Sequence, residues 1–311
     1  MDRKRTFGVR LVEFFMRLHA RLPLRYHYAW GRFASWLVGD VFRYRKDVVT
    51  ANLARSFPEM DYDDLETLSK QFYRHFGEIV AEAVWFGGCR GEKGRRKLID
   101  SHIVEIDNSA EFNAFFDRSS TVMLLNSHAG NWELMGGIAQ YDYGDPALRH
   151  WDYPEVVVLY KALYSKFWDR VMGDNRCAPV SDRNYEGYVE ADSILRFAIA
   201  HRREKKLYVF NTDQYPYWLV QRYDVGTFLN QQTLAMGGGA VLACKMGMSV
   251  AYIRWKREGR GHYKMTFVPL CEDASESTPD EIMRLYYKHL EEDIQAQPWN
   301  YLWTHKRWRK K

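Results

Sequence analysis

Apolar runs of strand length alternate with helical segments from residue 121 onwards, and this alternation constrains the fold more than any other feature. Five runs are predicted strands: residues 121–125, 155–160, 207–211, 249–255 and 262–268. Residues 163–172, 192–201 and 234–246 are predicted helices. The pattern is typical of an α/β domain with a mostly parallel central sheet flanked by helices. The last two strands, joined by 256–261 with two glycines, are expected to form an antiparallel hairpin.

The N-terminal segment, residues 1–60, is predicted to be an amphipathic, membrane-associating extension of a main domain at 61–311. Residues 9–22 place Leu11, Phe15 and Leu18 at helical spacing, and Pro23 ends or kinks that helix. A second apolar run at 33–39 is too short to cross a bilayer but suits a headgroup layer. The alternative is that the apolar stripe packs on the rest of the domain. Residues 61–86 are predicted to form one long helix with an acidic first turn.

The two ends of the chain are basic and rich in aromatic residues. Residues 1–50 hold eleven Lys/Arg and four Asp/Glu, and the last seven residues hold five cations and no acid, although the net charge is only +5. Basic segments with aromatic residues suit either anionic lipid or nucleic acid. The aromatic C-terminal segment 299–311 either anchors at a membrane, docks an acidic partner or packs on the domain.

Several classes of protein are excluded by composition. No stretch approaches the roughly 20 apolar residues of a membrane-spanning helix, which excludes a polytopic membrane protein. Arginines interrupt the N-terminal apolar run, so a secretory signal is not expected and the protein should stay on the cytoplasmic side. The four cysteines are far apart with no CxxC pair, which argues against a zinc knuckle or a disulfide framework.

The most informative stretch for chemistry is 121–137, in which an apolar strand ends at Asn126 and a helix is predicted to begin near Asn131. His128 follows the strand, where loops of open α/β sheets gather catalytic groups. Glu133 lies five residues on, and a loop-to-helix turn could bring its carboxylate to the imidazole. A carboxylate on one ring nitrogen raises the basicity of the other, as a general base requires. We therefore expect His128 to be the base and Glu133 its orienting partner.

Other interpretations of this stretch are weaker. A structural histidine is the more common outcome for a single His near a strand end. A metal site is not expected, because two ligands need a third and neither HExxH nor a cysteine cluster is present. Ser127 does not fit a nucleophile elbow, because the surrounding residues do not read GxSxG.

The ordered motifs of this chain resemble those of the bacterial lipid A late acyltransferases, within the wider lysophospholipid acyltransferase group. The block at 126–133 is similar to that family's HX4(D/E) block. The further similar segments, in the family's order, are 22–25, 44–46, 56–59, 72–76, 160–161, 169–170, 213–214, 227–233 and 301–308. The resemblance therefore covers nearly the whole chain.

The resemblance implies transfer of a fatty acyl chain from an acyl carrier protein thioester to a hydroxyl of a lipid A precursor. The expected partners are acyl carrier protein, anionic membrane lipid and the lipid A precursor, with no nucleic acid. The expected location is the cytoplasmic face of the inner membrane, in a peripheral or monotopic arrangement. A thioester is already activated, so no metal or redox cofactor is expected.

The substrate-binding candidates are polar residues near predicted strand ends or on predicted basic faces. Asn131 and the Gly130 N–H are candidate donors to the oxyanion, and Arg176 is a further candidate for substrate phosphate. Lys161 stands where many relatives carry arginine, which puts a bidentate phosphate contact in doubt. The full set is Asn126, Asn131, Lys161, Arg170, Asp213, Gln214 and Arg254.

Two alternatives stay open at this level. The first keeps the His-Glu mechanism but changes the acceptor to a lysophospholipid or another hydroxylated lipid. The second is a nucleic-acid-binding or membrane-binding module without catalysis, motivated by the basic aromatic ends. In that case His128→Ala would leave function intact, and binding would fall steeply with salt.

Overall fold

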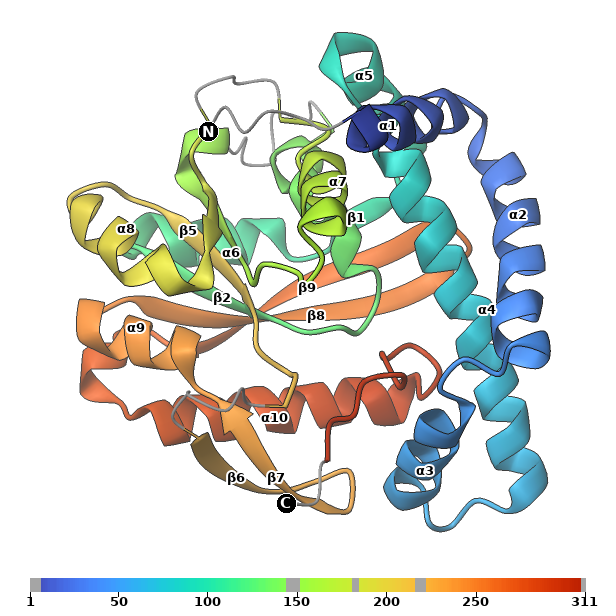
Figure 1. Ribbon diagram of the computed structural model, residues 1–311. Coiled ribbons are helices and arrows are strands. Elements are labelled where there is room, and N and C mark those ends of the chain that lie inside the picture. Colours follow the sequence, from blue (N-terminus) through green and yellow to red (C-terminus); the bar gives the residue numbers. More distant parts are fainter. Residues whose placement is uncertain (1–6, 144–151, 181–184, 216–221, 309–311) are drawn as a thin grey trace.

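A seven-stranded, mostly parallel sheet forms the centre of the protein, as the computed structural model shows for residues 7–143, 152–180, 185–215 and 222–308. The strand order is β1-β9-β8-β2-β5-β3-β4, and only the β8–β9 pair is antiparallel (Figure 1). The strands are β1 (Val104–Ile106), β2 (Val122–Asn126), β3 (Val156–Tyr160), β4 (Tyr188–Glu190), β5 (Leu207–Asn211), β8 (Ser249–Gly259) and β9 (His262–Cys271). A separate antiparallel pair is formed by β6 (Arg222–Phe228) and β7 (Gln231–Met236).

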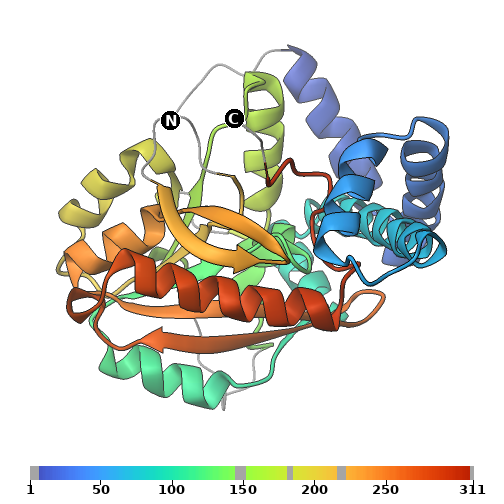
Figure 2. The same ribbon diagram turned by 90° about the horizontal axis from the view of Figure 1, so that it is seen from below.

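Helices cover both faces of the sheet and its far end. They are α1 (Phe7–His19), α2 (Leu24–Trp36), α3 (Lys46–Ser56), α4 (Tyr62–Phe86), α5 (Gly91–Ser101), α6 (Ser109–Arg118), α7 (Lys166–Arg176), α8 (Ile194–Ala200), α9 (Gly238–Met246) and α10 (Pro279–Ala296). Short turns of helix are η1 (Leu37–Val41, a π-helix), η2 (Trp132–Gln140), η3 (Tyr153–Glu155), η4 (Ala191–Ser193) and η5 (Ala274–Glu276). Figure 2 shows α10 and α6 on opposite sides of the β8–β9 ribbon, with the N-terminal helices beyond its end.

The predicted α/β class, the five predicted strands and the β8–β9 hairpin are confirmed. The central strand β2 is buried at every position, as expected for a parallel strand covered on both faces. The prediction of one helix over 234–246 is wrong in its first part, because residues up to Met236 belong to β7 and α9 begins at Gly238. Strands β1, β4 and β6 were not predicted from the sequence, because two are only three residues long and the third carries charged residues.

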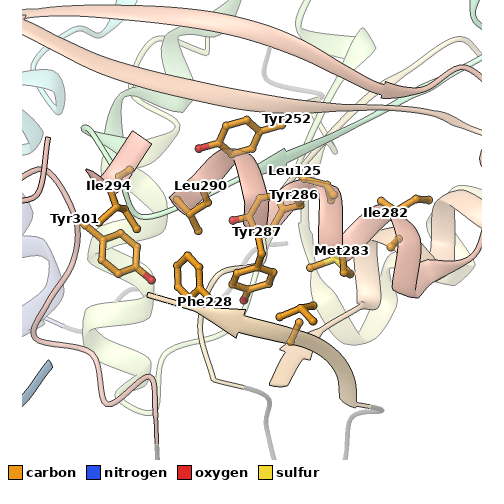
Figure 3. Packing of buried hydrophobic residues seen from close by; sticks show 14 of the residues in the cluster. Leu125, Phe228, Tyr252, Ile282, Met283, Tyr286, Tyr287, Leu290, Ile294 and Tyr301 are labelled. Atoms are coloured by element: carbon orange, nitrogen blue, oxygen red, sulfur yellow. The ribbon is translucent and has the colours of Figure 1, made fainter. Parts of the chain in front are cut away.

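The core on one face lies between the sheet, α9, α10 and the β6–β7 pair. Leu125 and Tyr252 project from the sheet toward Leu290 of α10, and Phe228 closes the cluster from β6 (Figure 3). Helix α10 begins with a capping box, in which Thr278 and Glu281 exchange side-chain and backbone hydrogen bonds around Pro279. Helix α10 therefore buries one side, with Ile282, Met283, Tyr286, Tyr287, Leu290 and Ile294, against this face of the sheet.

The core on the other face is built from alternate residues of the same strands. Val122 and Leu124 of β2 are fully buried against residues of α4, α5, α6 and η2, including Phe86, Leu98 and Leu134. Helix α4 spans nearly the predicted 61–86, with Asp61 as its N-cap accepting a hydrogen bond from the Asp64 N–H. The two faces together bury the strands that carry the site.

The N-terminal helices pack on α4 and turn their apolar side chains outward. Helices α2 and α4 cross where Gly31 and Gly77 touch, and a Cβ added at either glycine would lie within 2.7 Å of the other's carbonyl oxygen. In α1 the stripe residues Leu11, Phe15 and Leu18 are exposed, whereas Val9 and Glu13 are buried. The stripe therefore does not pack on the domain. The boundary at residue 60 stays a prediction.

The C-terminal segment does pack on the domain. Trp303 is fully buried and Tyr301 nearly so, and the guanidinium of Arg307 donates to the hydroxyl of Tyr287 on α10. Within the described ranges, no helix is long and apolar enough to cross a membrane.

Candidate active site

His128 lies at the carboxyl end of β2 and is bonded to Asp213, which follows the neighbouring parallel strand β5. The two strands pair in register up to Asn126 and Asn211, so the residues that follow both strands meet at one edge of the sheet. The distance from His128 Nδ1 to Asp213 Oδ1 is 2.7 Å, and Asp213 is almost fully buried. Burial alone would raise the pKa of this carboxyl group, but the charge and hydrogen bonds of His128 outweigh it and lower the pKa. Asp213 is therefore held as a carboxylate against the imidazole.

The partners of His128 define its tautomer. A carboxylate only accepts hydrogen bonds, so Nδ1 carries the proton and Nε2 presents a lone pair. The side-chain amide nitrogen of Gln214 lies 3.3 Å from Nε2 and donates to it. The ring of Trp132 contacts the imidazole edge-on, with 4.9 Å between ring centroids. Nε2 is thus the basic nitrogen, and it borders the cavity described below.

Glu133 does not carry out the predicted pairing with His128, since its carboxylate is bonded elsewhere. Arg176 of α7 donates from Nε to Oε2 at 2.7 Å and from a terminal nitrogen to Oε1 at 2.6 Å, and the Trp132 indole N–H also donates to Oε1. Burial disfavours the charge of Arg176, but the two hydrogen bonds and the charge of Glu133 outweigh it and raise the pKa of the guanidinium. The orienting carboxylate on His128 is Asp213. The spacing in the sequence could not predict this contact, because the long side chain of Glu133 on η2 also reaches α7.

The loop between His128 and η2 requires glycine at position 130. Gly130 has a φ of +66°, and a Cβ there would lie 2.5 Å from the Cβ of Trp255. Its N–H donates to the backbone oxygen of Asn300 and to the Asn300 side chain, at 3.2 and 3.1 Å. The Gly130 N–H is therefore bonded within the protein, and its expected role as an oxyanion donor stays a prediction.

Asn131 and Asn126 are fully buried and act within the protein. Asn131 caps η2 by accepting from the Glu133 N–H, and its amide donates to Glu82. Asn126 donates to Asn211 and accepts from the Trp255 indole. Neither side chain lines the cavity. Both side chains therefore help to build the loop, and the substrate-binding role expected of them stays a prediction.

Glu82 anchors this loop to the N-terminal helices. Its carboxyl group accepts hydrogen bonds at 2.7 Å from Tyr28 of α2, from Asn131 and from Tyr263 of β9. Full burial raises the pKa of Glu82 in spite of these three donors. The hydrogen bonds connect α2, α4, the His128 loop and β9 through one buried carboxyl group.

A cavity of about 930 Å³ begins at His128 and extends between η2, α7 and strands β3 and β5. Val156 of β3 lines it and pairs in register with Leu207, four residues before Asn211. The cavity therefore extends roughly 13 Å along the strands from the histidine end. Apolar lining side chains include Met135, Ile138, Val156, Val158, Leu159, Leu163, Val180, Val209, Phe210, Met236, Val241 and Leu302. Its lining is mostly apolar, as a site for a hydrocarbon chain requires, although Glu133, Arg176, Lys161 and Asp192 also line it besides His128.

The family model described as bacterial lipid A biosynthesis acyltransferase matches residues 1–157 and 188–310. The chain belongs to this family. The match spans nearly the whole length, confirms the resemblance carried by the ordered motifs and establishes the protein as an acyltransferase of the lipid A pathway. No curated protein gives a match to the chain.

The three cationic residues predicted to bind substrate lie in different parts of the acyltransferase. Lys161 lines the cavity at its exposed rim, where its ammonium group bonds both carboxylate oxygens of Asp192 at 2.8 Å. Arg170 is partly exposed on α7 and does not line the cavity. Arg254 bonds Asp293 and Glu292 of α10, on the other side of the sheet from η2. Only Lys161 remains near the site.

Several residues that line the cavity of the acyltransferase could not be assigned to it from the sequence. Arg176 is a sequence candidate for binding substrate phosphate, and in the structure its guanidinium donates two hydrogen bonds to the carboxylate of Glu133. Tyr160 and Tyr188 stack in the cavity wall, with ring centroids 4.0 Å apart and nearly parallel rings, and no motif of the chain indicates this pair. Gly237 and Gly238, at the start of α9, also line the cavity. Among the described residues, no group of three or more His, Cys, Asp and Glu side chains is arranged to hold a metal ion.

Proposed function

We propose that this acyltransferase moves a fatty acyl chain from an acyl carrier protein thioester to a hydroxyl of a lipid A precursor, with His128 as general base. The observation that carries the proposal is the position of His128: Nδ1 is fixed by Asp213 while Nε2 borders an apolar cavity long enough for a hydrocarbon chain. The family supplies the lipid A pathway. The donor, the acceptor hydroxyl and the roles of individual residues are the proposal.

The proposed reaction is one addition and one elimination. Nε2 of His128 takes the proton of the acceptor hydroxyl as its oxygen forms a bond to the thioester carbonyl carbon. The tetrahedral intermediate collapses, the carbon–sulfur bond breaks, and the imidazolium returns the proton to the leaving thiolate. The products are an ester and the free phosphopantetheine thiol, so atoms and charge balance without a cofactor.

Asp213 and Gln214 are proposed to act directly around the imidazole. The Asp213 carboxylate keeps the proton on Nδ1 and stabilises the imidazolium that forms during transfer. The Gln214 amide now occupies the Nε2 lone pair, which is the place that the acceptor hydroxyl must take. Once displaced, this donor lies within reach of the carbonyl oxygen and is the proposed oxyanion contact.

Glu133 is proposed to be a positioning residue for the cavity wall. Through Arg176 it ties η2, which carries the wall residues Met135 and Ile138, to the end of α7. The pair is nearly electroneutral, so it fixes the wall without adding net charge beside the acyl chain. This role replaces the direct His-Glu contact expected from the sequence.

The N-terminal helices are proposed to associate with the cytoplasmic face of the inner membrane. The exposed aromatic residues of α1 and α2 are Phe7, Phe14, Phe15, Tyr26, Trp30, Phe33 and Trp36. Large exposed apolar areas on a protein surface mark interaction sites, and the acceptor is itself a membrane lipid. A peripheral or monotopic arrangement would give the cavity access to a lipid acceptor.

The test is a donor and acceptor panel with purified full-length protein. Labelled acyl groups are offered on acyl carrier protein and on coenzyme A, with an under-acylated lipid A precursor or a lysophospholipid as acceptor. Transfer from acyl carrier protein to the lipid A precursor supports the proposal. Transfer only to lysophospholipid would overturn the acceptor, and equal use of coenzyme A would overturn the donor.

A further inference from the structure

A second concave region lies between the N-terminal helices and shares no residue with the His128 cavity. This region, the basic cleft, has a volume of about 360 Å³ between α2, η1, α3 and α4. It is lined by four cationic side chains, one carboxylate and several polar or aromatic groups: Arg32, Lys46, Lys70, Arg74, Asp40, Ser35, Ser69, Trp36, Tyr73 and Gly39. The charges in the wall are therefore predominantly positive.

Three of the four cations have no carboxylate partner among the residues that the structure describes. Lys70 is 3.2 Å from Glu66 on the same helix. The side chains of Arg32, Lys46 and Arg74 form no hydrogen bond or ion pair with any residue in the described part of the chain. Like charges gathered in a concave wall repel each other unless an anion is bound between them. Phosphate oxygens match the donors of arginine and lysine in charge and geometry.

The walls of the basic cleft are held in place by close packing. A Cβ on Gly39 would lie 2.8 Å from the ring of Tyr73, so η1 rests directly on α4. The hydroxyl of Tyr73 donates to the backbone oxygen of Tyr44 at 2.6 Å. The Gly31–Gly77 crossing fixes α2 on α4 a few turns away. The helices that form the walls are thus held in place, whereas the side chains of Arg32, Lys70 and Arg74 are exposed to solvent.

The basic cleft is continuous with exposed aromatic side chains. Trp36 lines the cleft and is also half exposed. Its ring is 5.9 Å from that of Phe33, which is 6.0 Å from Trp30, and all three are about half exposed. Phe42 is 69% exposed on the following turn. Aromatic rings beside cations are suited to the headgroup level of a bilayer, where apolar and charged lipid groups meet.

We propose that the basic cleft binds the phosphate of an anionic phospholipid headgroup while the adjoining aromatic rings enter the headgroup layer. The proposal rests on the membrane association proposed above and goes beyond it, because it assigns a defined lipid-binding site that is separate from the acyl-transfer cavity. It commits to a membrane lipid over a soluble phosphate because the aromatic rings adjoin the cations.

The test compares two double variants of the full chain that lose the same charge. Arg32→Gln/Arg74→Gln empties the cleft of two cations, whereas Arg10→Gln/Arg25→Gln removes two exposed cations of the same N-terminal segment outside it. Binding is measured by flotation with vesicles of phosphatidylcholine alone and of phosphatidylcholine with phosphatidylglycerol. We expect wild type to prefer the anionic vesicles, and the cleft variant to need at least about fivefold more anionic lipid than the control variant.

Other outcomes separate this proposal from the proposed function. Equal losses of vesicle binding in both variants would overturn the cleft as the binding site, because the overall positive charge of the N-terminal segment would then explain the binding. Wild-type protein that binds neither vesicle would overturn lipid binding altogether, whereas acyl transfer in detergent micelles tests catalysis independently. In that micellar assay the cleft variant should keep the wild-type rate and acceptor KM. A rise in acceptor KM there would contradict the proposal, because it would assign the cleft to a phosphate of the acceptor.

Discussion

His128 Nδ1 and Asp213 Oδ1 are 2.7 Å apart although the two residues are separated by 85 positions in the chain. The pair is a product of the sheet, since β2 and β5 are parallel neighbours in register and both residues follow the ends of their strands. Glu133 is close in sequence but bonded to Arg176. Topology, and not local spacing, therefore selects the carboxylate that bonds the imidazole of His128.

Asp213→Asn should lower kcat for acyl transfer by about 10² to 10⁴-fold. An asparagine amide that donates to Nδ1 favours the tautomer with its proton on Nε2, which removes the base. The thermal midpoint and the acceptor KM should change little, because the side chain keeps its shape. Steady-state transfer assays with thermal melts check this, with Asp192→Asn at the cavity rim as the control carboxylate. Activity within threefold of wild type in Asp213→Asn would refute the orienting role.

Glu133→Gln should destabilise the protein by about 1.5 to 3 kcal/mol, because it leaves the partly buried guanidinium of Arg176 without its counter-charge. The double variant Glu133→Gln/Arg176→Met should recover much of that loss, which denaturant unfolding of the full cycle measures. The pH profile of kcat in Glu133→Gln should keep its wild-type midpoint, because Asp213 still holds the imidazole. A midpoint displaced from the wild-type value would instead identify Glu133 as the orienting carboxylate.

The fold was largely predictable from the sequence, and the site only in part. Apolar runs locate β2, β3, β5 and β8, because a strand covered on both faces is apolar along most of its length. Strand β9 instead alternates apolar Tyr263, Met265 and Phe267 with polar residues, as a strand buried on one face does. The polar residues that follow β2 and β5 could be placed together because the carboxyl ends of parallel strands meet at one edge of a sheet. This reasoning places His128, Asp213 and Gln214 in one region, as the structure does.

The contacts of individual polar residues could not be predicted, because they depend on segments distant in the chain. Asn131 was a candidate for substrate binding, but it is fully buried against Glu82 of α4, 49 residues earlier. Arg254 lies within a predicted strand, and nothing in the pattern of that strand indicates its ion pair with Asp293 of α10. A sequence gives the residue types available for a site, whereas packing decides which of them face the cavity.

Val158→Phe should shorten the longest acyl chain that is accepted efficiently. Val158 lies midway along the part of β3 that lines the cavity, and a larger ring there occupies space needed by the distal methylenes. We expect kcat/KM to fall by about tenfold or more for the longest accepted donor and by less than threefold for a short one. A panel of acyl carrier protein thioesters measures this, with the exposed Leu285→Phe as control. An equal loss for all chain lengths would argue against this cavity as the acyl site.

Glu78→Gln should destabilise the protein at neutral pH and much less in acid. Glu78 is buried between Arg257 and Arg260. Burial would raise its pKa, but hydrogen bonds and charges from His75, Arg257 and Arg260 outweigh it and lower the pKa from 4.5 to about 2. A lowered folded-state pKa gives stability that is present above about pH 4.5 and is lost as pH falls toward 2.

The loss in Glu78→Gln is expected to be about 3 to 5 kcal/mol at pH 7 and to narrow steadily below pH 4.5. Denaturant unfolding at several pH values measures the difference. The exposed pair of Glu258 with Lys256 provides the control, because Glu258→Gln should cost less than about 1 kcal/mol at any pH. A difference that stays constant from pH 7 to pH 3 would contradict the assigned ionisation of Glu78.

The most direct measurement of the central claim is single-turnover transfer of a labelled acyl group from acyl carrier protein to an under-acylated lipid A precursor, with wild-type protein and His128→Ala. Transfer that is complete in wild type and slower by at least about 10²-fold in His128→Ala, with an unchanged melting temperature, is the predicted result. Transfer at the wild-type rate in folded His128→Ala would contradict the assignment of His128 as the base.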